Sequence, residues 1–229
     1  ALIGKGMAYR NAKQYAEALS EYKTVVGMLP GSEYSEEAML AINSIYQTTG
    51  EPEKYLEYLE ENNLGAGKSA AEREEIWFNT AEQVFLAGNY AQAVNSLRKY
   101  MQEFPEGSRT GDALFYLGEC YRSMGEKEKA AESYASVARY LKKGAVAENA
   151  ARNFAAVSYE LERFQDAYDG YLLLGGIAVM QENKNAAAAG QMRSAFRAKR
   201  YEDAVSAAGL VRKISPLPAD LSREADYLT

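Results

Sequence analysis

Apolar residues recur along this chain at the spacing of one helix face, and one pattern of six positions is repeated. The apolar positions are i, i+1, i+4, i+7, i+8 and i+11, which lie on one side of an α-helix. The full copies are Ala93, Val94, Leu97, Tyr100, Met101 and Phe104; Ala18, Leu19, Tyr22, Val25, Val26 and Leu29; and Ala130, Ala131, Tyr134, Val137, Ala138 and Leu141. The pattern predicts three amphipathic helices built on one template.

Weaker copies of this pattern fill the gaps between the three full ones. Its first position falls at residues 18, 55, 93, 130, 167 and 204, in steps of 37 or 38 residues. A fixed period of this length is typical of solenoids in which each repeat is a pair of helices. Gly88 and Gly125 precede the second helices, where glycine suits a left-handed helix end. Pro30 and Pro105 follow two of the copies and should stop those helices.

The expected fold is an all-α, right-handed superhelical solenoid of antiparallel helix pairs, with about six repeats and a terminal helix. The expected repeats are 1–32, 33–68, 69–107, 108–144, 145–182 and 183–218, followed by a terminal helix at 219–229. Asn43 and Tyr55 stand where other repeats have small residues, so the second repeat should pack least regularly. Because the sequence begins and stops inside a first helix, we expect it to be a fragment of a longer protein.

The repeated residues resemble the tetratricopeptide repeat, whose signature combines Trp, Leu-Gly, Tyr, Ala, an aromatic residue and Pro in two antiparallel helices. The matching residues are Trp77, Leu117, Gly118 and Tyr121, with Gly6 and Tyr9 in the first repeat. Small residues at these positions let two helices approach closely, while large ones fill the space between pairs. The resemblance implies a module that binds a protein or peptide.

The turn at residues 104–108, Phe-Pro-Glu-Gly-Ser, resembles a repeat variant common in bacterial envelope proteins. Examples of that variant are the outer-membrane-protein assembly lipoprotein and the periplasmic coordinator of the Tol-Pal system. Pro-Gly-Ser at residues 30–32 is a shorter counterpart. The resemblance implies a location in the periplasm or at the outer membrane of a bacterium, with a cytoplasmic location as the alternative. Because no window approaches ~18 uninterrupted apolar residues, we expect no membrane-spanning helix.

Composition argues against several classes of function. The chain has 32 acidic and 26 basic residues, a net charge of −6, which opposes non-specific binding to nucleic acid. It contains no histidine and one cysteine, so the commonest acid–base group and cysteine-based metal sites are absent. Cys120 lies in a predicted helix next to Glu119, where we expect a buried, unreactive thiol. We expect no catalysis, no cofactor and no metal ion.

Gly-Ala-Gly-Lys-Ser at residues 65–69 resembles the end of a phosphate-binding P-loop. The first glycine of that motif would fall at Asn62, and the preceding residues, 51–60, are charged and helical rather than a buried strand. Ser69 and Glu72 instead have the spacing of a capping box at the start of the next helix. We therefore interpret this segment as a loop between repeats.

We expect the protein to be a non-catalytic scaffold that binds a partner in its concave groove; the alternative is a regulatory or sensor module of a larger enzyme or transcription regulator. In the resembling family the first helix of each pair lines that groove. The candidate partner-binding residues are Arg10, Gln47, Phe78, Glu82, Phe85, Phe115, Glu119, Arg122, Arg152, Tyr159 and Arg193, and Met7, Leu40 and Phe196 lie at equivalent positions. Phe78, Phe85 and Phe115 would form an apolar patch flanked by charge. Alternatively, they pack between successive first helices and never contact a ligand. The identity of the partner and the oligomeric state stay open.

Overall fold

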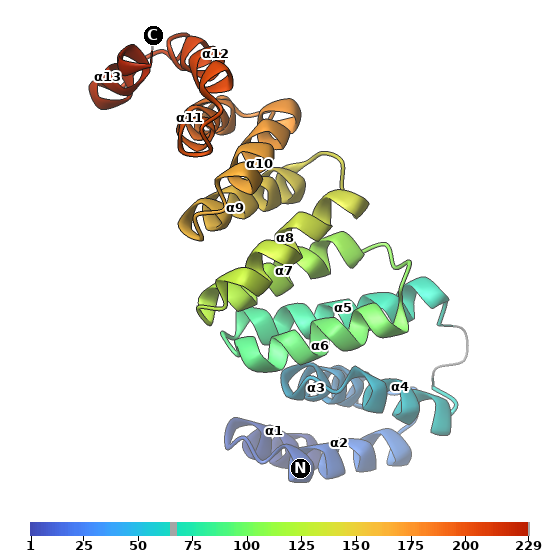
Figure 1. Cartoon of the computed structure of the whole chain (residues 1–229). Helices are drawn as coiled ribbons and strands as arrows, with labels where there is room; N and C mark the ends of the chain where they lie inside the picture. The colour runs from blue at the N-terminus through green and yellow to red at the C-terminus, as the bar shows by residue number, and fades with distance from the viewer. Residues whose placement is uncertain (65–67, 229) are drawn as a thin grey trace. The chain divides into compact units, whose positions relative to one another are not determined.

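The computed structural model describes residues 1–64 and 68–228, and this part of the chain contains thirteen α-helices and no strand (Figure 1). The helices are α1 (Leu2–Asn11), α2 (Tyr15–Met28), α3 (Glu33–Thr49), α4 (Pro52–Glu61), α5 (Ala70–Leu86), α6 (Tyr90–Glu103), α7 (Thr110–Ser123), α8 (Lys127–Tyr140), α9 (Ala145–Glu160), α10 (Phe164–Ile177), α11 (Gln181–Arg197), α12 (Tyr201–Val211) and α13 (Ala219–Tyr227). The predicted all-α helical-repeat fold is confirmed.

The helices pack as consecutive pairs, and α13 follows the sixth pair. A tight turn joins the two helices of each pair, and one residue of every turn has a positive φ angle. These residues are Lys13, Gly50, Gly88, Gly125, Glu162 and Lys199, again 37 or 38 residues apart. Glycine adopts this left-handed conformation without strain, whereas a residue with a Cβ atom adopts it at a cost. The sequence nevertheless supplies glycine at only three of the six equivalent turns, and Lys13, Glu162 and Lys199 adopt the costly conformation at the other three.

The helices belong to two compact units, Ala1–Gly107 and Ser108–Thr229. Within the first unit, α1 contacts α3 and α3 contacts α5; within the second, α7 contacts α9 and α9 contacts α11. Successive first helices of the pairs therefore form a continuous layer inside each unit. The second helices α2, α8 and α10 also contact the first helix of the following pair.

The core depends on residues of complementary size at positions sixteen residues apart in the two helices of a pair. Gly118 on α7 lies against the ring of Tyr134 on α8, and an added Cβ atom would be 2.5 Å from that ring. Gly6 on α1 meets the ring of Tyr22 in the same way. In the sixth pair the sizes are reversed, because Met192 and Ala208, both buried, hold these positions. Each of these pairs therefore fills its interface with one small and one larger residue.

The first position of the six-residue pattern lies on the buried face of each second helix. Alanine holds it in five of the pairs, and all five alanines are fully buried: Ala18, Ala93, Ala130, Ala167 and Ala204. Tyr55 takes this position in α4 and is buried as well. Burial of the small residue allows the paired helix axes to approach, which is the packing that the repeat pattern predicted.

The second pair differs from the others in its packing. Its second helix, α4, has 10 residues, whereas α2, α6, α8 and α10 have 14 each. Asn43 on α3 stands at the position that Gly118 holds in the fourth pair. Its Oδ1 atom is buried without a hydrogen-bond partner in the described part of the chain. A buried polar atom without a partner lowers stability, which agrees with the expectation of irregular packing in this repeat.

Candidate functional site

The candidate residues of the first unit lie on α1, α3 and α5, and their exposure differs. Arg10 and Gln47 are half-buried. Phe78 is fully buried, and its ring packs edge-on against Tyr100 at a centroid distance of 5.6 Å. Phe78 is therefore a core residue, which corrects the expectation that it contributes to an exposed patch. Its position supports the alternative that this phenylalanine packs inside the repeat.

Two further candidates on α5 keep partial exposure. Phe85 is half-buried and lies 5.9 Å from the ring of Tyr90, at the turn between α5 and α6. Glu82 is half-buried one helical turn before it. Phe115 belongs to the other unit. The proposed patch of three phenylalanines is thus reduced, within the first unit, to Phe85 alone.

In the second unit, Glu119 on α7 is the centre of a hydrogen-bonded cluster. The hydroxyl of Tyr134 donates to Glu119 Oε1 at 2.6 Å, and the amide of Asn153 donates to the same atom at 2.7 Å. Arg122 donates to Glu119 Oε2 at 3.1 Å. Burial, followed by the bond to Glu119, raises the pKa of the Tyr134 hydroxyl. Both carboxylate oxygens are engaged, so Glu119 joins α7, α8 and α9 in this structure.

The remaining candidates of the second unit lie on α7, α9 and α11, the first helices of successive pairs. Phe115 is half-buried, with its ring 6.0 Å from that of Tyr134. Arg152 on α9 donates to Asn149 at 3.4 Å, and Tyr159 packs edge-on against Phe164 at 5.2 Å. These side chains have apolar and polar neighbours within their own pair. The remaining candidate, Arg193 on α11, lines a groove.

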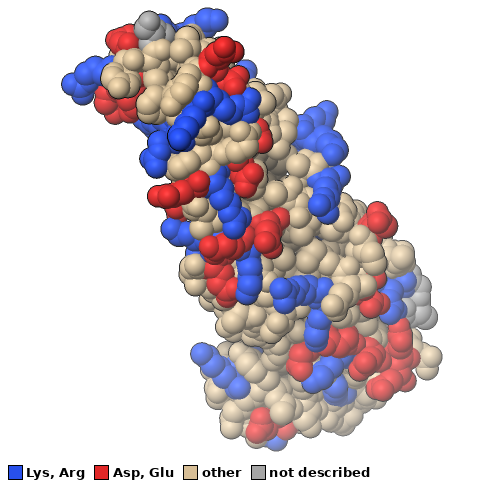
Figure 2. Space-filling view, in the orientation of Figure 1, with Lys and Arg blue, Asp and Glu red and all other residues tan. Residues whose placement is uncertain are grey.

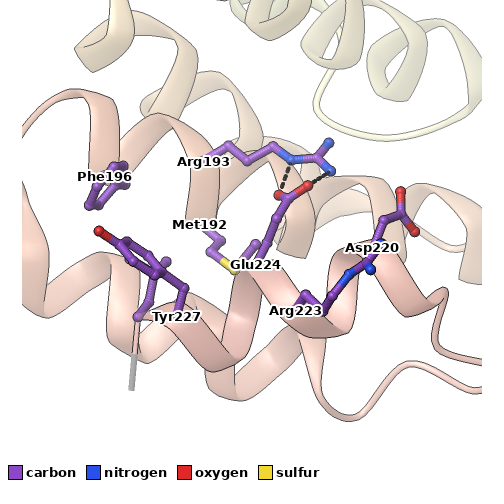
Figure 3. Close-up of a pocket in the computed structure, with 8 residues that line it drawn as sticks. Met192, Arg193, Phe196, Asp220, Arg223, Glu224 and Tyr227 are labelled. Carbon is purple, nitrogen blue, oxygen red and sulfur yellow. Dashed lines mark hydrogen bonds and ion pairs between the residues drawn. The ribbon is translucent and has the colours of Figure 1, made fainter.

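That groove lies between α11 and α13 and has a volume of about 480 Å³ (Figure 3). Its lining consists of Met192, Arg193, Phe196, Asp220, Arg223, Glu224, Tyr227 and Leu228. We call it the α11–α13 groove. Met192 is buried, whereas 38% of Phe196 and 82% of Tyr227 are exposed. The two aromatic rings approach edge to face, with centroids 6.4 Å apart.

A bidentate ion pair between Arg193 and Glu224 forms another wall of the α11–α13 groove. Arg193 Nε lies 2.6 Å from Glu224 Oε2, and Arg193 Nη2 lies 2.8 Å from Glu224 Oε1 (Figure 3). The hydrogen bonds to Glu224 raise the pKa of Arg193. Both side chains are more than one third exposed, so the pair contributes at most about 1 kcal/mol to stability. Its main effect is to hold both side chains in fixed positions beside the aromatic rings.

Residues of α13 complete this site although the sequence pattern did not single them out. Glu224 and Tyr227 follow Arg193 and Phe196 by the same interval of 31 residues, and both pairs are three residues apart. This spacing places each pair on one helix face. The repeated interval was the available signal. It differs from the repeat period, because α11 begins at Gln181 and α13 at Ala219, 38 residues later; Glu224 and Tyr227 therefore lie about two helical turns before the positions equivalent to Arg193 and Phe196.

Two sequence hypotheses about reactive sites can be compared with the structure. Cys120 is buried, and burial, followed by the Glu119 charge, raises the pKa of its thiol to about 12. Ser69 and Glu72 form the predicted capping box at the start of α5. Residues 65–67 of the P-loop-like segment lie outside the described residues. Among those that are described, no group of three His, Cys, Asp or Glu side chains is arranged to hold a metal ion.

Charged residues of both signs are interspersed on the face of the molecule shown in Figure 2. In the described part of the chain, every helix is either too short or too polar to cross a membrane.

Comparison with known proteins assigns one repeat directly. Residues 112–140, which span most of α7 and α8, match the family model of the tetratricopeptide repeat. This segment is therefore similar to a tetratricopeptide repeat. It contains the Leu117–Gly118 and Tyr121 positions that carried the resemblance in the sequence. No curated protein sequence matches the chain.

Solved structures are similar to the chain at low sequence identity. MamA AMB-1 superposes with a TM-score of 0.51 at 13% identity, covering 97% of this chain and 94% of that one. PilF of Pseudomonas aeruginosa has a TM-score of 0.49 at 17% identity, with coverage of 99% and 96%. PilW, described as a type IV pilus biogenesis factor, has a TM-score of 0.49 at 15% identity, with coverage of 97% and 96%. The likeness to MamA concerns the helical-repeat fold alone.

Proposed function

We propose that this protein is a non-catalytic scaffold that binds a segment of a partner protein in the α11–α13 groove. The observation that carries the proposal is the pair of exposed rings, Phe196 and Tyr227, above the buried side chain of Met192. Aromatic side chains in a concave site, with charged groups at the edge, are the usual composition of a binding hot spot. Arg193 and Glu224 supply that charged edge.

An apolar side chain of the partner is the group that gains most free energy by entering the groove. Burying a leucine- or phenylalanine-sized side chain removes apolar surface from water and contributes about 1.5–3 kcal/mol. Exposed aromatic rings also lose little conformational entropy on binding, because they have only two rotatable side-chain bonds. The groove therefore offers a gain in free energy that a flat, charged surface would not.

Photo-crosslinking tests this proposal even though the partner is not identified. Tyr227 is replaced by benzoylphenylalanine, a photoreactive residue of similar shape, and the protein is irradiated in native extract. The matched control carries benzoylphenylalanine at Tyr140, which is 44% exposed in the same unit and does not line the α11–α13 groove. We expect a defined product from position 227 only.

The captured partner is then purified and its affinity measured with Phe196→Ser and Tyr227→Ser. Truncation of a hot-spot aromatic costs about 2 kcal/mol or more, so the dissociation constant should rise at least about 30-fold. The melting temperature of Tyr227→Ser should stay unchanged because the ring is 82% exposed. Equal crosslinking at both positions, or unchanged affinity of both variants, would refute the groove as the binding site.

We further propose a bacterial envelope location, in the periplasm or at the outer membrane. The support is the resemblance of residues 104–108 and 30–32 to repeats of envelope proteins. Fractionation of the native organism tests it: the protein should be released with periplasmic contents or recovered with outer membranes. Recovery with the cytoplasmic fraction would contradict the proposal.

A further inference from the structure

A second groove in the Ser108–Thr229 unit lies between α10, α11 and the end of α12, away from the residues of the α11–α13 groove. Its volume is about 470 Å³. The residues that line it include Leu172, Gly176, Lys184, Leu210, Lys213 and Ile214. We call it the α10–α12 groove. None of these residues lines the α11–α13 groove, so the two sites can be altered independently.

A smaller groove of about 220 Å³ occupies the equivalent place one repeat earlier, between α8, α9 and α10. Its Leu173 and Ile177 correspond to Leu210 and Ile214, each 37 residues later. The groove is therefore a feature of the repeat, and the α10–α12 copy is the wider of the two.

Gly176 explains why the α10–α12 groove is wide. It is in the last turn of α10 and presents backbone instead of a side chain, whereas Gln191 fills the space beside the neighbouring Gly175, where its Nε2 atom would lie 2.9 Å from an added Cβ atom. A Cβ atom on Gly176 would meet nothing within 4 Å. On either side, Leu172 is 52% and Leu210 is 45% exposed. An unfilled space between two exposed leucines can accept an apolar side chain.

The charge of this groove is positive although the protein is acidic. Lys184 and Lys213 are its only charged lining residues, and neither has an ion-pair partner in the part of the chain that the structure describes. The whole chain has 32 acidic and 26 basic residues, so a rim without carboxylates runs against the average composition. The free carbonyl groups at the end of α10 carry partial negative charge and cannot make the groove positive. The positive electrostatic potential of the groove therefore comes from the two lysine side chains.

From this combination we infer that the α10–α12 groove binds an acidic amphipathic segment of a partner protein. A leucine-type side chain enters the space over Gly176, between Leu172 and Leu210. Carboxylates that flank this side chain in the segment lie beside Lys184 and Lys213. Apolar contact supplies affinity, and the lysines select for acidic sequences and make binding sensitive to salt.

Fluorescence anisotropy with three short labelled peptides tests this inference on the full chain. The peptides are built from Leu and Glu, from Leu and Lys, and from Ser and Glu. We expect the Leu/Glu peptide to bind, with affinity that falls as salt is added, and the other two to bind at least about tenfold more weakly. Equal affinity for the Leu/Lys peptide would overturn the electrostatic part of the inference and with it the choice of an acidic partner.

Two variants locate the binding. Gly176→Leu fills the groove and should weaken Leu/Glu binding at least about tenfold, because the inserted side chain takes the place of the peptide leucine. Gly27→Leu is the matched control: it has the equivalent position in α2, and a Cβ atom there also meets nothing within 4 Å. Lys184→Gln with Lys213→Gln should weaken binding similarly and remove its salt dependence. Circular dichroism and melting curves check that each variant is folded.

Unchanged binding by Gly176→Leu, or an equal loss with Gly27→Leu, would overturn the inference. Binding of the wild-type protein to phosphatidylglycerol vesicles without binding of the Leu/Glu peptide would assign the groove to an anionic membrane surface instead. A wild-type dimer that Gly176→Leu converts to a monomer would assign it to a second copy of the chain. Both of these results contradict the proposed partner. Because Phe196→Ser leaves the α10–α12 groove intact, it should bind the Leu/Glu peptide like the wild type.

Discussion

Gly118→Ala should destabilise the protein although alanine is the better helix former. In α7 the added Cβ atom would lie 2.5 Å from one carbon of the Tyr134 ring and 2.6 Å from another. Favourable contact between carbon atoms needs about 3.5 Å or more, so ring and helix must separate by about 1 Å. The ring cannot easily move, because Tyr134 is 1% exposed and its hydroxyl is bonded to Glu119.

The magnitude follows from two opposing effects. Overpacking of a dense core costs about 1–3 kcal/mol, while replacing glycine by alanine inside a helix contributes about 0.5–1 kcal/mol. We expect a net loss of about 1–2 kcal/mol. Gly209→Ala, in α12 of the same unit, is the matched control, because a Cβ atom there meets nothing within 4 Å. That variant should be stabilised by up to about 1 kcal/mol.

A double mutant separates the steric cause from any other effect of the substitution. Gly118→Ala with Tyr134→Leu reproduces the combination of Ala81 and Leu97, which hold the equivalent positions of the third pair and are fully buried. The two changes together should cost at least about 1 kcal/mol less than the sum of the single changes. Urea unfolding followed by circular dichroism measures all four proteins. A Gly118→Ala variant as stable as the wild type, or strictly additive effects, would refute the size-complementarity argument.

Three further predictions concern other parts of the fold. Lys199→Gly should stabilise the chain by about 0.5–1 kcal/mol in urea unfolding, and Gly125→Ala should destabilise it by a similar amount, because both residues have positive φ angles; opposite signs would contradict the strain argument. Glu148→Ala should cost about 2–3 kcal/mol, since the buried Glu148 accepts hydrogen bonds from Asn183 and the Val179 amide; an unchanged melting temperature would argue against it. The Cys120 thiol should react with thiol reagents only after unfolding. Because burial raises its pKa to about 12 from the usual 9.0, its contribution to stability is present below pH 9 and is lost as the pH rises toward 12; rapid labelling of the native protein would exclude this.

The sequence predicted the helices and their pairing into repeats for the same physical reason. A helix must bury one face, so the positions of apolar residues at i, i+4 and i+7 report that face directly. The helix ends predicted from the prolines are confirmed: α2 ends at Met28, two residues before Pro30, and α6 ends at Glu103, two residues before Pro105. A residue before proline is restricted to extended conformations, which is a local effect and is readable from sequence.

Burial of individual candidates depended on neighbours that the pattern did not identify. Phe78 and Phe115 have equivalent positions 37 residues apart, yet Phe78 is fully buried and Phe115 is half-buried. Periodicity assigns both residues to the same helix face, but it does not say how large the residues across the interface are. The ring of Tyr100 covers Phe78, and this contact arises only when α5 and α6 are packed together.

By itself, then, the sequence determined which segments are helical, which faces they bury and where the chain turns. Each of these depends on interactions within a few residues. Tertiary structure alone decided where empty space remains. The α11–α13 groove exists because α13 returns beside α11, and the α10–α12 groove exists because no side chain fills the space over Gly176. A groove is a gap in the packing between helices. Local periodicity does not say whether a side chain of a neighbouring helix fills that gap, because the size of that side chain and its distance are set by the tertiary packing.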